Sequence, residues 1–148
     1  MIYLGGTFDL LHEGHIELLR EASKFGKVIV ALNTDEFCER YKGKKPILPY
    51  SERKIMLEAV KYVYLVVKNI GGEDSKVTIN ALKYGMCEET SEQIKIDAVA
   101  HGTDWTGDSL YKQMGFTQEW LNKEMISMLY IPRTTGESTT RIKERLNE

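Results

Sequence analysis

The stretch Ile2-Tyr3-Leu4-Gly5-Gly6-Thr7-Phe8-Asp9-Leu10-Leu11-His12-Glu13-Gly14-His15 decides the fold. It runs from a short apolar segment, through a loop that begins with two glycines, into a segment that we expect to be helical. Glycines let the backbone come close to an anion, and the free N–H groups and positive dipole end of a helix favour a phosphate there. The order strand, glycine loop, helix therefore predicts an anion-binding site at the start of an α/β domain.

Four further apolar runs follow along the chain, and none shows the polar alternation of a sheet with one wet face. They predict strands that are buried on both faces. With the first run included, the predicted strands are residues 2–4, 28–32, 62–67, 98–100 and 128–131.

Helical patterns separate these runs. Leu18, Ala22 and Phe25 recur at i, i+4 and i+7, which predicts a first helix that ends at Gly26. A second apolar stripe predicts a helix that Ser51 caps, and further helices are expected at about 74–84, from Thr117 onward, and after a Ser138 cap. The members of the second stripe are Ile55, Met56, Ala59, Val60 and Val63.

This alternation predicts one Rossmann-like domain over residues 1–148, a doubly wound α/β fold with a parallel sheet of about five strands. Ligands of such sheets bind at the carboxyl ends of the strands. Residues 39–49 and 106–116 are predicted to be long loops, which in a compact domain are often functional.

Charge and composition exclude several classes of function. The 20 Lys and Arg residues against 22 Asp and Glu residues give a net charge of −2, which argues against nucleic-acid binding. No apolar run approaches the roughly 20 residues that span a bilayer, so we expect no membrane span and no signal peptide. Two distant cysteines, Cys38 and Cys87, argue against a disulfide framework, and a cytoplasmic location is expected.

Two of the three histidines, His12 and His15, lie three residues apart at the predicted start of the first helix. They are placed to donate hydrogen bonds to one phosphate; alternatively, one of them caps the helix or pairs with a buried carbonyl. A metal site made with Cys38 lacks the ordered set of ligands that zinc requires, so no resident metal is expected.

The segment 41–61 is basic although the chain is acidic. It carries six cationic side chains against Glu52 and Glu58, a local net charge of +4. Such a segment attracts anions, unless it is simply a solvated loop. The cations are Lys42, Lys44, Lys45, Arg53, Lys54 and Lys61.

The motifs Gly6-Thr7-Phe8-Asp9 and His12-Glu13-Gly14-His15 resemble the GTFD and HxGH signatures of the nucleotidyltransferase superfamily. The run Arg133-Thr134-Thr135-Gly136-Glu137-Ser138-Thr139-Thr140 resembles the RTxGxSTT signature of its cytidylyltransferases, and the glycerol-3-phosphate cytidylyltransferases are the most similar group. The resemblance covers residues 1 to 68, 101–105 and 130–148.

The resemblance implies transfer of CMP from CTP to the phosphate of a small acceptor, with release of pyrophosphate. It also implies Mg²⁺ as a companion of CTP and a homodimer. Glycerol 3-phosphate is the default acceptor. Alternatives are another acceptor, such as a phosphorylated amino acid or a phosphonate used in surface-polysaccharide modification, adenylyl transfer, and nucleotide binding without catalysis.

By the same resemblance, individual residues receive roles. The predicted catalytic residues are His12, His15, Lys44 and Arg133. The predicted nucleotide-binding residues are Thr7, Phe8, Asp9, Gly14, Asp104, Trp105, Thr134, Gly136, Ser138, Thr139 and Thr140. The predicted acceptor-binding residues are Lys42, Lys76 and Lys112. Lys45 is expected to face solvent, and Arg53 is expected either to bridge loops or to form a surface salt bridge.

Three segments depart from the pattern of the glycerol-phosphate enzymes. Tyr64 and Leu65 replace an acidic pair near the expected subunit contact. Residues 68–76 replace a segment near the acceptor, and the region between Trp105 and Tyr130 is longer. The departures therefore place the choice of acceptor on residues 68–76 and 106–129.

Overall fold

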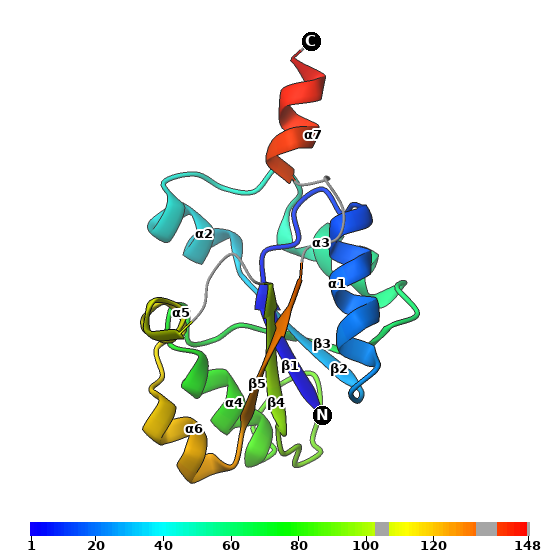
Figure 1. Cartoon of the computed structure of the whole chain (residues 1–148). Coiled ribbons are helices and arrows are strands. Elements are labelled where there is room, and N and C mark those ends of the chain that lie inside the picture. The colour runs from blue at the N-terminus through cyan, green and yellow to red at the C-terminus, as the bar shows by residue number, and fades with distance from the viewer. Residues whose placement is uncertain (103–106, 133–138, 148) are drawn as a thin grey trace.

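The computed structural model describes residues 1–102, 107–132 and 139–147, and in this part of the chain one parallel sheet forms the centre of the molecule (Figure 1). The strands lie in the order β3-β2-β1-β4-β5, and every neighbouring pair is parallel. This confirms the predicted fold class. The strands are β1 (Ile2–Gly6), β2 (Val28–Leu32), β3 (Val63–Lys68), β4 (Ala98–Gly102) and β5 (Ser127–Ile131).

Helices cover both faces of the sheet (Figure 1). On one face, α1 (Glu13–Ser23) and α3 (Tyr50–Glu58) contribute Leu19 and Leu57 to the core. On the other face pack α4 (Ser75–Lys83), α5 (Gly107–Met114) and α6 (Gln118–Glu124). The helices α2 (Asp35–Lys42) and α7 (Thr139–Leu146) lie beyond the carboxyl ends of the strands.

The strands alternate between two separate apolar cores. Ile2 and Leu4 of β1 belong to the core under α1 and α3, whereas Tyr3 belongs to the core under α4, α5 and α6. All five residues of β2 are buried. Because both faces are covered, the strands read as unbroken apolar runs, which is why the sequence pattern predicted them correctly.

The chain order reverses at β1, which has β2 on one side and β4 on the other. After β1 the chain builds outward to β2 and β3, and it then crosses back to β4 and β5. Loops at the carboxyl ends of β1 and β4 therefore diverge from each other, and a ligand crevice is expected at this position.

Two helices lie where the sequence predicted loops. Helix α2 extends to Lys42 and ends at Gly43, which has a φ of 84°. Helix α5 occupies most of 106–116, with Leu110 and Met114 on its buried side. Both helices have only eight residues, and α2 exposes most of its side chains, so too few apolar positions recur for a periodic pattern to stand out.

Several predicted boundaries and faces are wrong. Helix α1 ends at Ser23, before Gly26, and Phe25 is 63% exposed. Pro49, not Ser51, is the N-cap of α3. In α3 the buried side chains are Arg53 and Leu57, and the predicted stripe is mostly exposed or lies beyond the helix, because a buried arginine occupies its inner face.

The other three predicted helices are present as α4, α6 and α7, although the predicted cap of α7, Ser138, lies outside the described residues. Helix α4 begins after Asp74, whose side chain accepts a hydrogen bond from the N–H of Lys76, and α6 begins after Thr117. Nowhere in the described ranges is there a helix that combines the length and the apolarity needed to cross a bilayer.

The two apolar side chains Leu19 and Phe25 test this packing. Leu19 is completely buried, so Leu19→Ala is expected to lower the free energy of unfolding by about 2–5 kcal/mol. Phe25→Ala removes an exposed ring and is expected to stay within about 0.5 kcal/mol of the parent. Urea denaturation measures both. A larger loss for Phe25→Ala would restore the helix face predicted from the sequence.

Candidate active site

The loop between β1 and α1 holds an unusual backbone. Phe8 and Leu10 have φ values of 51° and 50°, a conformation that L-residues rarely adopt. The Phe8 ring lies so close to Gly6 that a Cβ at position 6 would be 2.8 Å from it. A side chain at position 6 would therefore displace the Phe8 ring. Strained backbone of this kind persists where surrounding contacts hold it, and it concentrates at functional sites.

The two histidines form a capping box at the start of α1. Nδ1 of His12 accepts from the N–H of Gly14 at 3.0 Å, and Nδ1 of His15 accepts from the N–H of His12 at 3.3 Å. The rings are stacked with centroids 3.8 Å apart. Because each Nδ1 is an acceptor, the proton of each neutral ring lies on Nε2. The cap thus fixes two Nε2–H donors beside each other.

Arg53 joins three loops of the site. Its side chain is completely buried. Nη1 donates to the carbonyl oxygens of Thr7 and Asn33, both at 2.8 Å, and Nε donates to that of Leu48 at 2.9 Å. These carbonyls follow β1, follow β2 and precede α3. The prediction that Arg53 bridges loops is confirmed, and the alternative of a surface salt bridge is wrong.

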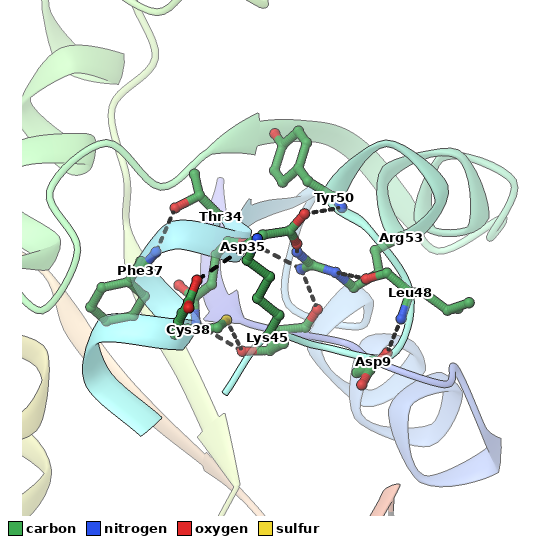
Figure 2. A network of polar contacts seen from close by, with 12 residues as sticks. Asp9, Thr34, Asp35, Phe37, Cys38, Lys45, Leu48, Tyr50 and Arg53 are labelled. Atoms are coloured by element: carbon green, nitrogen blue, oxygen red, sulfur yellow. Dashed lines mark hydrogen bonds and ion pairs between the residues drawn. The ribbon is translucent and has the colours of Figure 1, made fainter. Parts of the chain in front are cut away.

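Asp35 neutralises this buried guanidinium. Its Oδ1 accepts from Nη2 of Arg53 at 2.5 Å, and its Oδ2 accepts from the N–H of Tyr50 at 3.2 Å. Figure 2 shows these residues converging from α2 and α3. A buried charge is tolerated when it is paired and hydrogen-bonded, and four of the five N–H groups of Arg53 donate to these partners. The first turns of α2 and α3 are consequently tied together.

Asp9 fastens the basic loop that connects α2 to α3. Its carboxylate is almost buried and accepts from the N–H groups of Ile47 at 2.8 Å and Leu48 at 3.0 Å. Nζ of Lys143 on α7 lies 3.9 Å from Oδ2. The carboxylate therefore positions a loop and meets a cation from the end of the chain. Its predicted contact with the nucleotide stays a prediction.

A cavity of about 590 Å³ opens between the β1–α1 loop, the basic loop and α7. Four lysines line it, against the carboxylates of Asp9 and Glu144, so the cavity suits a large anion. Lys45 is among its lining residues, and its side chain is 65% exposed, in agreement with the prediction that it faces solvent. The lining residues are Thr7, Phe8, Asp9, His15, Cys38, Lys42, Lys44, Lys45, Pro46, Thr140, Lys143, Glu144 and Asn147.

A second, smaller cavity of about 170 Å³ lies on the other side of Thr7 and Lys42, which line both cavities. Its walls come from the ends of β1, β2 and β4, from the β3–α4 connection and from α5. Its lining residues are Tyr3, Gly5, Gly6, Thr7, Asn33, Phe37, Tyr41, Lys42, Asn69, Gly72, Glu73, Ser75, His101, Gln113 and Met114. Two adjoining cavities can hold two reactants side by side.

Tyrosines at the site stay protonated. Burial raises the pKa of Tyr3 well above its ordinary value, although its hydroxyl is hydrogen-bonded to Ser75 and Thr78. Burial, and after it the nearby Glu89 carboxylate, raises the pKa of Tyr50 to about 12. Both phenols are neutral at physiological pH. They offer hydrogen bonds and packing, not a base.

The predicted acceptor lysines behave differently from one another. Lys42 lies where the two cavities meet. Lys76 and Lys112 line neither cavity: the Lys76 ammonium contacts Asp74 and the carbonyl of Gly115, and Lys112 is exposed on α5. The structure places neither lysine on the wall of these two cavities, and their predicted contacts with an acceptor stay predictions.

Other predicted residues fall into three groups. Gly14 lies in the first turn of α1, where its N–H caps His12, and Thr140 of α7 lines the larger cavity. Thr139 is the first residue of α7. Six predicted residues lie outside the described residues: Asp104, Trp105, Arg133, Thr134, Gly136 and Ser138.

Two asparagines of the site were not predicted from the sequence. Asn33 follows β2 and Asn69 follows β3, and Nδ2 of Asn69 donates to Oδ1 of Asn33 at 2.8 Å. Nδ2 of Asn33 donates in turn to Oγ1 of Thr7 at 3.1 Å. Polar residues directly after buried strands were the signal that could have identified them.

Within the described part of the chain, no three His, Cys, Asp or Glu side chains gather as a metal site would require. Asp9 is the nearest candidate, but both of its oxygens already accept backbone hydrogen bonds. Cys38 and Cys87 are free thiols, so no disulfide forms.

Comparison with known proteins gives concordant similarities. The chain is 39% identical to a glycerol-3-phosphate cytidylyltransferase of Staphylococcus aureus, over 95% of this chain and 90% of that protein. It is 37% identical to the Bacillus subtilis protein of the same name, over 95% of this chain and 92% of that one. An FAD synthase of Pyrococcus horikoshii is 30% identical over 99% of this chain and 92% of that protein.

A solved structure shares the fold. The lipopolysaccharide core biosynthesis protein from Thermoplasma volcanium superposes with a TM-score of 0.63 at 24% identity, covering 92% of this chain and 97% of that chain. The family model described as Cytidylyltransferase-like matches residues 3–145, nearly the whole chain. The protein belongs to the cytidylyltransferase-like family.

Proposed function

We propose that the protein transfers CMP from CTP to the phosphate of a small acceptor and releases pyrophosphate. The observation that carries this proposal is the pair of adjoining cavities, one basic and one small, that meet at Thr7 and Lys42. A cytidylyltransferase-like chain needs two such places, because CTP and its acceptor must lie in contact.

The reaction forms one bond and breaks one bond. An oxygen of the acceptor phosphate attacks the α-phosphorus of CTP, and the bond from that phosphorus to the pyrophosphate oxygen breaks. The product carries the CDP group, and no covalent enzyme intermediate is required. Since both reactants are anionic, catalysis depends on orientation and on neutralising charge on the oxygens around the phosphorus.

The larger cavity suits the triphosphate of CTP. Lys44, Lys45 and Lys143 provide positive charge along it, and His15 borders it. The Nε2–H donors of His12 and His15 are assigned to the α-phosphoryl oxygens. Lys42, at the junction, is placed to bridge the acceptor phosphate and CTP. The family signature predicts further contacts to the nucleotide. They come from Asp104, Trp105, Arg133, Thr134, Gly136, Ser138 and Thr139.

Magnesium is proposed to enter with CTP and not as a resident ion. Mg²⁺ is commonly held by substrate phosphates with few protein ligands. Asp9 and Glu144 are the carboxylates that line the larger cavity among the described residues, and the oxygens of Asp9 already accept two backbone hydrogen bonds. The residues present therefore fit a metal that the triphosphate carries.

We also propose a homodimer in the cytoplasm. Ile55, Met56 and Tyr64 are exposed on α3 and on the edge strand β3. An apolar surface of this kind beside an open sheet edge favours pairing with a second copy. The free thiols Cys38 and Cys87 fit a reducing compartment. Sedimentation equilibrium that returned the monomer mass of 17.0 kDa at micromolar concentration would contradict the dimer.

A pyrophosphate-release assay with Mg²⁺ tests the proposed function. CTP is expected to react with glycerol 3-phosphate, the acceptor named in two relatives, or with another small phosphate or phosphonate such as a phosphorylated amino acid. ATP replaces CTP in a parallel series, because an FAD synthase is among the relatives. Turnover with ATP alone would favour adenylyl transfer. Binding of CTP without pyrophosphate release across the panel would favour a non-catalytic module.

His15 has two functions that two substitutions separate. His15→Ala removes both the imidazole donor and the cap, whereas His15→Gln keeps a capping-box acceptor at the N3 position of α1. Both variants are expected to lower kcat by about 10²- to 10³-fold, the usual effect of losing one oxyanion donor. Only His15→Ala is expected to lose about 1 kcal/mol of stability as well. A kcat within threefold of wild type in His15→Gln would remove His15 from the chemistry.

Arg53→Lys tests whether the guanidinium fork positions the site. Lysine keeps the charge but cannot reach three carbonyls and Asp35 at once. We expect kcat to fall on the order of 10²-fold, as small misplacements of catalytic groups commonly do, with a loss of about 1–3 kcal/mol in stability.

The matched control for Arg53→Lys is Arg20→Lys, since the Arg20 side chain is 46% exposed on α1. Arg20→Lys is expected to change neither kcat nor the free energy of unfolding. An Arg53→Lys enzyme that loses stability but keeps wild-type kcat would show that Arg53 supports the fold without positioning the reacting groups.

A further inference from the structure

The walls of the smaller cavity contain residues from two of the three segments in which the sequence departs from the glycerol-phosphate enzymes, residues 68–76 and 106–129. Gly72, Glu73 and Ser75 come from the β3–α4 connection, and Gln113 and Met114 come from the end of α5. Segments that lie far apart in the sequence therefore meet at one place. An assignment of a ligand to this cavity rests on the proposed function, because that ligand is the compound that accepts CMP.

The two segments are fastened to each other at Gly115. A Cβ at this position would lie 2.8 Å from Cα of Asp74 and 2.9 Å from the carbonyl oxygen of Glu73, so the backbones are in contact. The Lys76 ammonium reaches back to donate to the carbonyl of Gly115. The cavity wall is thereby fixed before any ligand arrives.

The core fixes the orientation of α5. Leu110 is completely buried, and Met114 and Phe116 are almost so. Gln113 lies three residues after Leu110 and one before Met114, so it shares their inward face. A glutamine on the inner face of an anchored helix has little freedom to turn to solvent. Gln113 is half-buried and belongs to the lining of the smaller cavity.

Most polar groups around this cavity are already paired. Asn69 donates to Asn33 and to the carbonyl of Gly72, and accepts from Thr78 at 3.2 Å. The exception is Gln113, whose Oε1 is buried and has no hydrogen-bond partner among the described residues. Leaving such an atom unpaired costs about 1–3 kcal/mol. Buried polar atoms without a hydrogen-bond partner are rare in native proteins, and each one calls for an explanation such as a bound ligand.

We propose that the amide of Gln113 is the specificity-determining group for the acceptor and that it binds a hydroxyl on the acceptor's tail. With the acceptor phosphate near Lys42, the tail extends toward α5. A hydroxyl can donate to Oε1 and accept from Nε2, so it satisfies either end of the amide. The acceptor is accordingly a small phosphate or phosphonate ester whose tail carries a hydroxyl.

The charges of the lining favour a hydroxyl over an ammonium group. Among the described residues that line the smaller cavity, Glu73 is the one carboxylate, and it already pairs with Nη2 of Arg40 at 3.2 Å. The other polar side chains of the wall are mostly amides and hydroxyls, such as Asn33, Asn69 and Ser75. Neutral groups of this kind can hydrogen-bond to an uncharged hydroxyl without burying a charge. An ammonium group would lose its hydration in the cavity and would find no carboxylate there that is not already paired.

Calorimetric titration of three phosphates into the nucleotide-free protein tests the proposal without any turnover. The probes are glycerol 3-phosphate, with hydroxyls on its tail, phosphoethanolamine, with an ammonium, and n-propyl phosphate, with neither. Wild type is expected to bind glycerol 3-phosphate about tenfold more tightly than n-propyl phosphate. Gln113→Met, nearly isosteric, is expected to reduce that ratio to near one. Gln113→Ala serves the same purpose if the methionine variant does not fold.

The control is Gln93→Met, an exposed glutamine before β4, which is expected to keep the wild-type ratio. Tighter binding of phosphoethanolamine, equal binding of all three probes by wild type, or an unchanged ratio in the Gln113 variants would each overturn the assignment. Pyrophosphate release from CTP is measured separately. A binding preference that depends on Gln113 without any release of pyrophosphate would leave this inference standing and refute the proposed function.

Discussion

The guanidinium of Arg53 has no contact with solvent and donates to carbonyl oxygens of Thr7, Asn33 and Leu48 while it pairs with Asp35. Each carbonyl belongs to a different loop, so one side chain sets how these loops approach one another. Removing these partners would leave a charge buried without compensation, which is strongly destabilising. Movement of any of these loops would therefore break hydrogen bonds of the buried guanidinium and raise the free energy of the folded protein. The site depends on that constraint.

Fixed loops give a small acidic protein a local site for anions. Around this frame lie the histidine pair, whose cap places both protons on Nε2, and a basic loop that Asp9 holds by the N–H groups of Ile47 and Leu48. The overall charge of −2 is unimportant at this range, because the lysines concentrate on one cavity. Apart from Lys42 and the paired Glu73, the polar side chains of the adjoining cavity are mostly uncharged, and we propose that this cavity holds the acceptor.

The features that could be predicted from the sequence are those that depend on residues close together in the chain. Strands buried on both faces read as apolar runs, and the glycines and histidines of the β1–α1 loop read as an anion site, so the sheet and the position of the site were predictable. Arg53 on the inner face of α3 was harder to identify, since a charged residue normally points outward. Gln113 could not be identified, because its significance comes from the packing of Gly115 against Asp74, a contact between distant segments.

The central claim is that the buried guanidinium fixes the loops before any nucleotide binds. Solvent exchange of the Nε–H proton of Arg53, followed by NMR in the nucleotide-free protein, measures this directly. The account predicts exchange that is orders of magnitude slower than at the exposed Arg20 and that changes little when CTP is added. Exchange of Arg53 as fast as that of Arg20, slowing only with CTP, would show that the ligand assembles the site and would contradict the account.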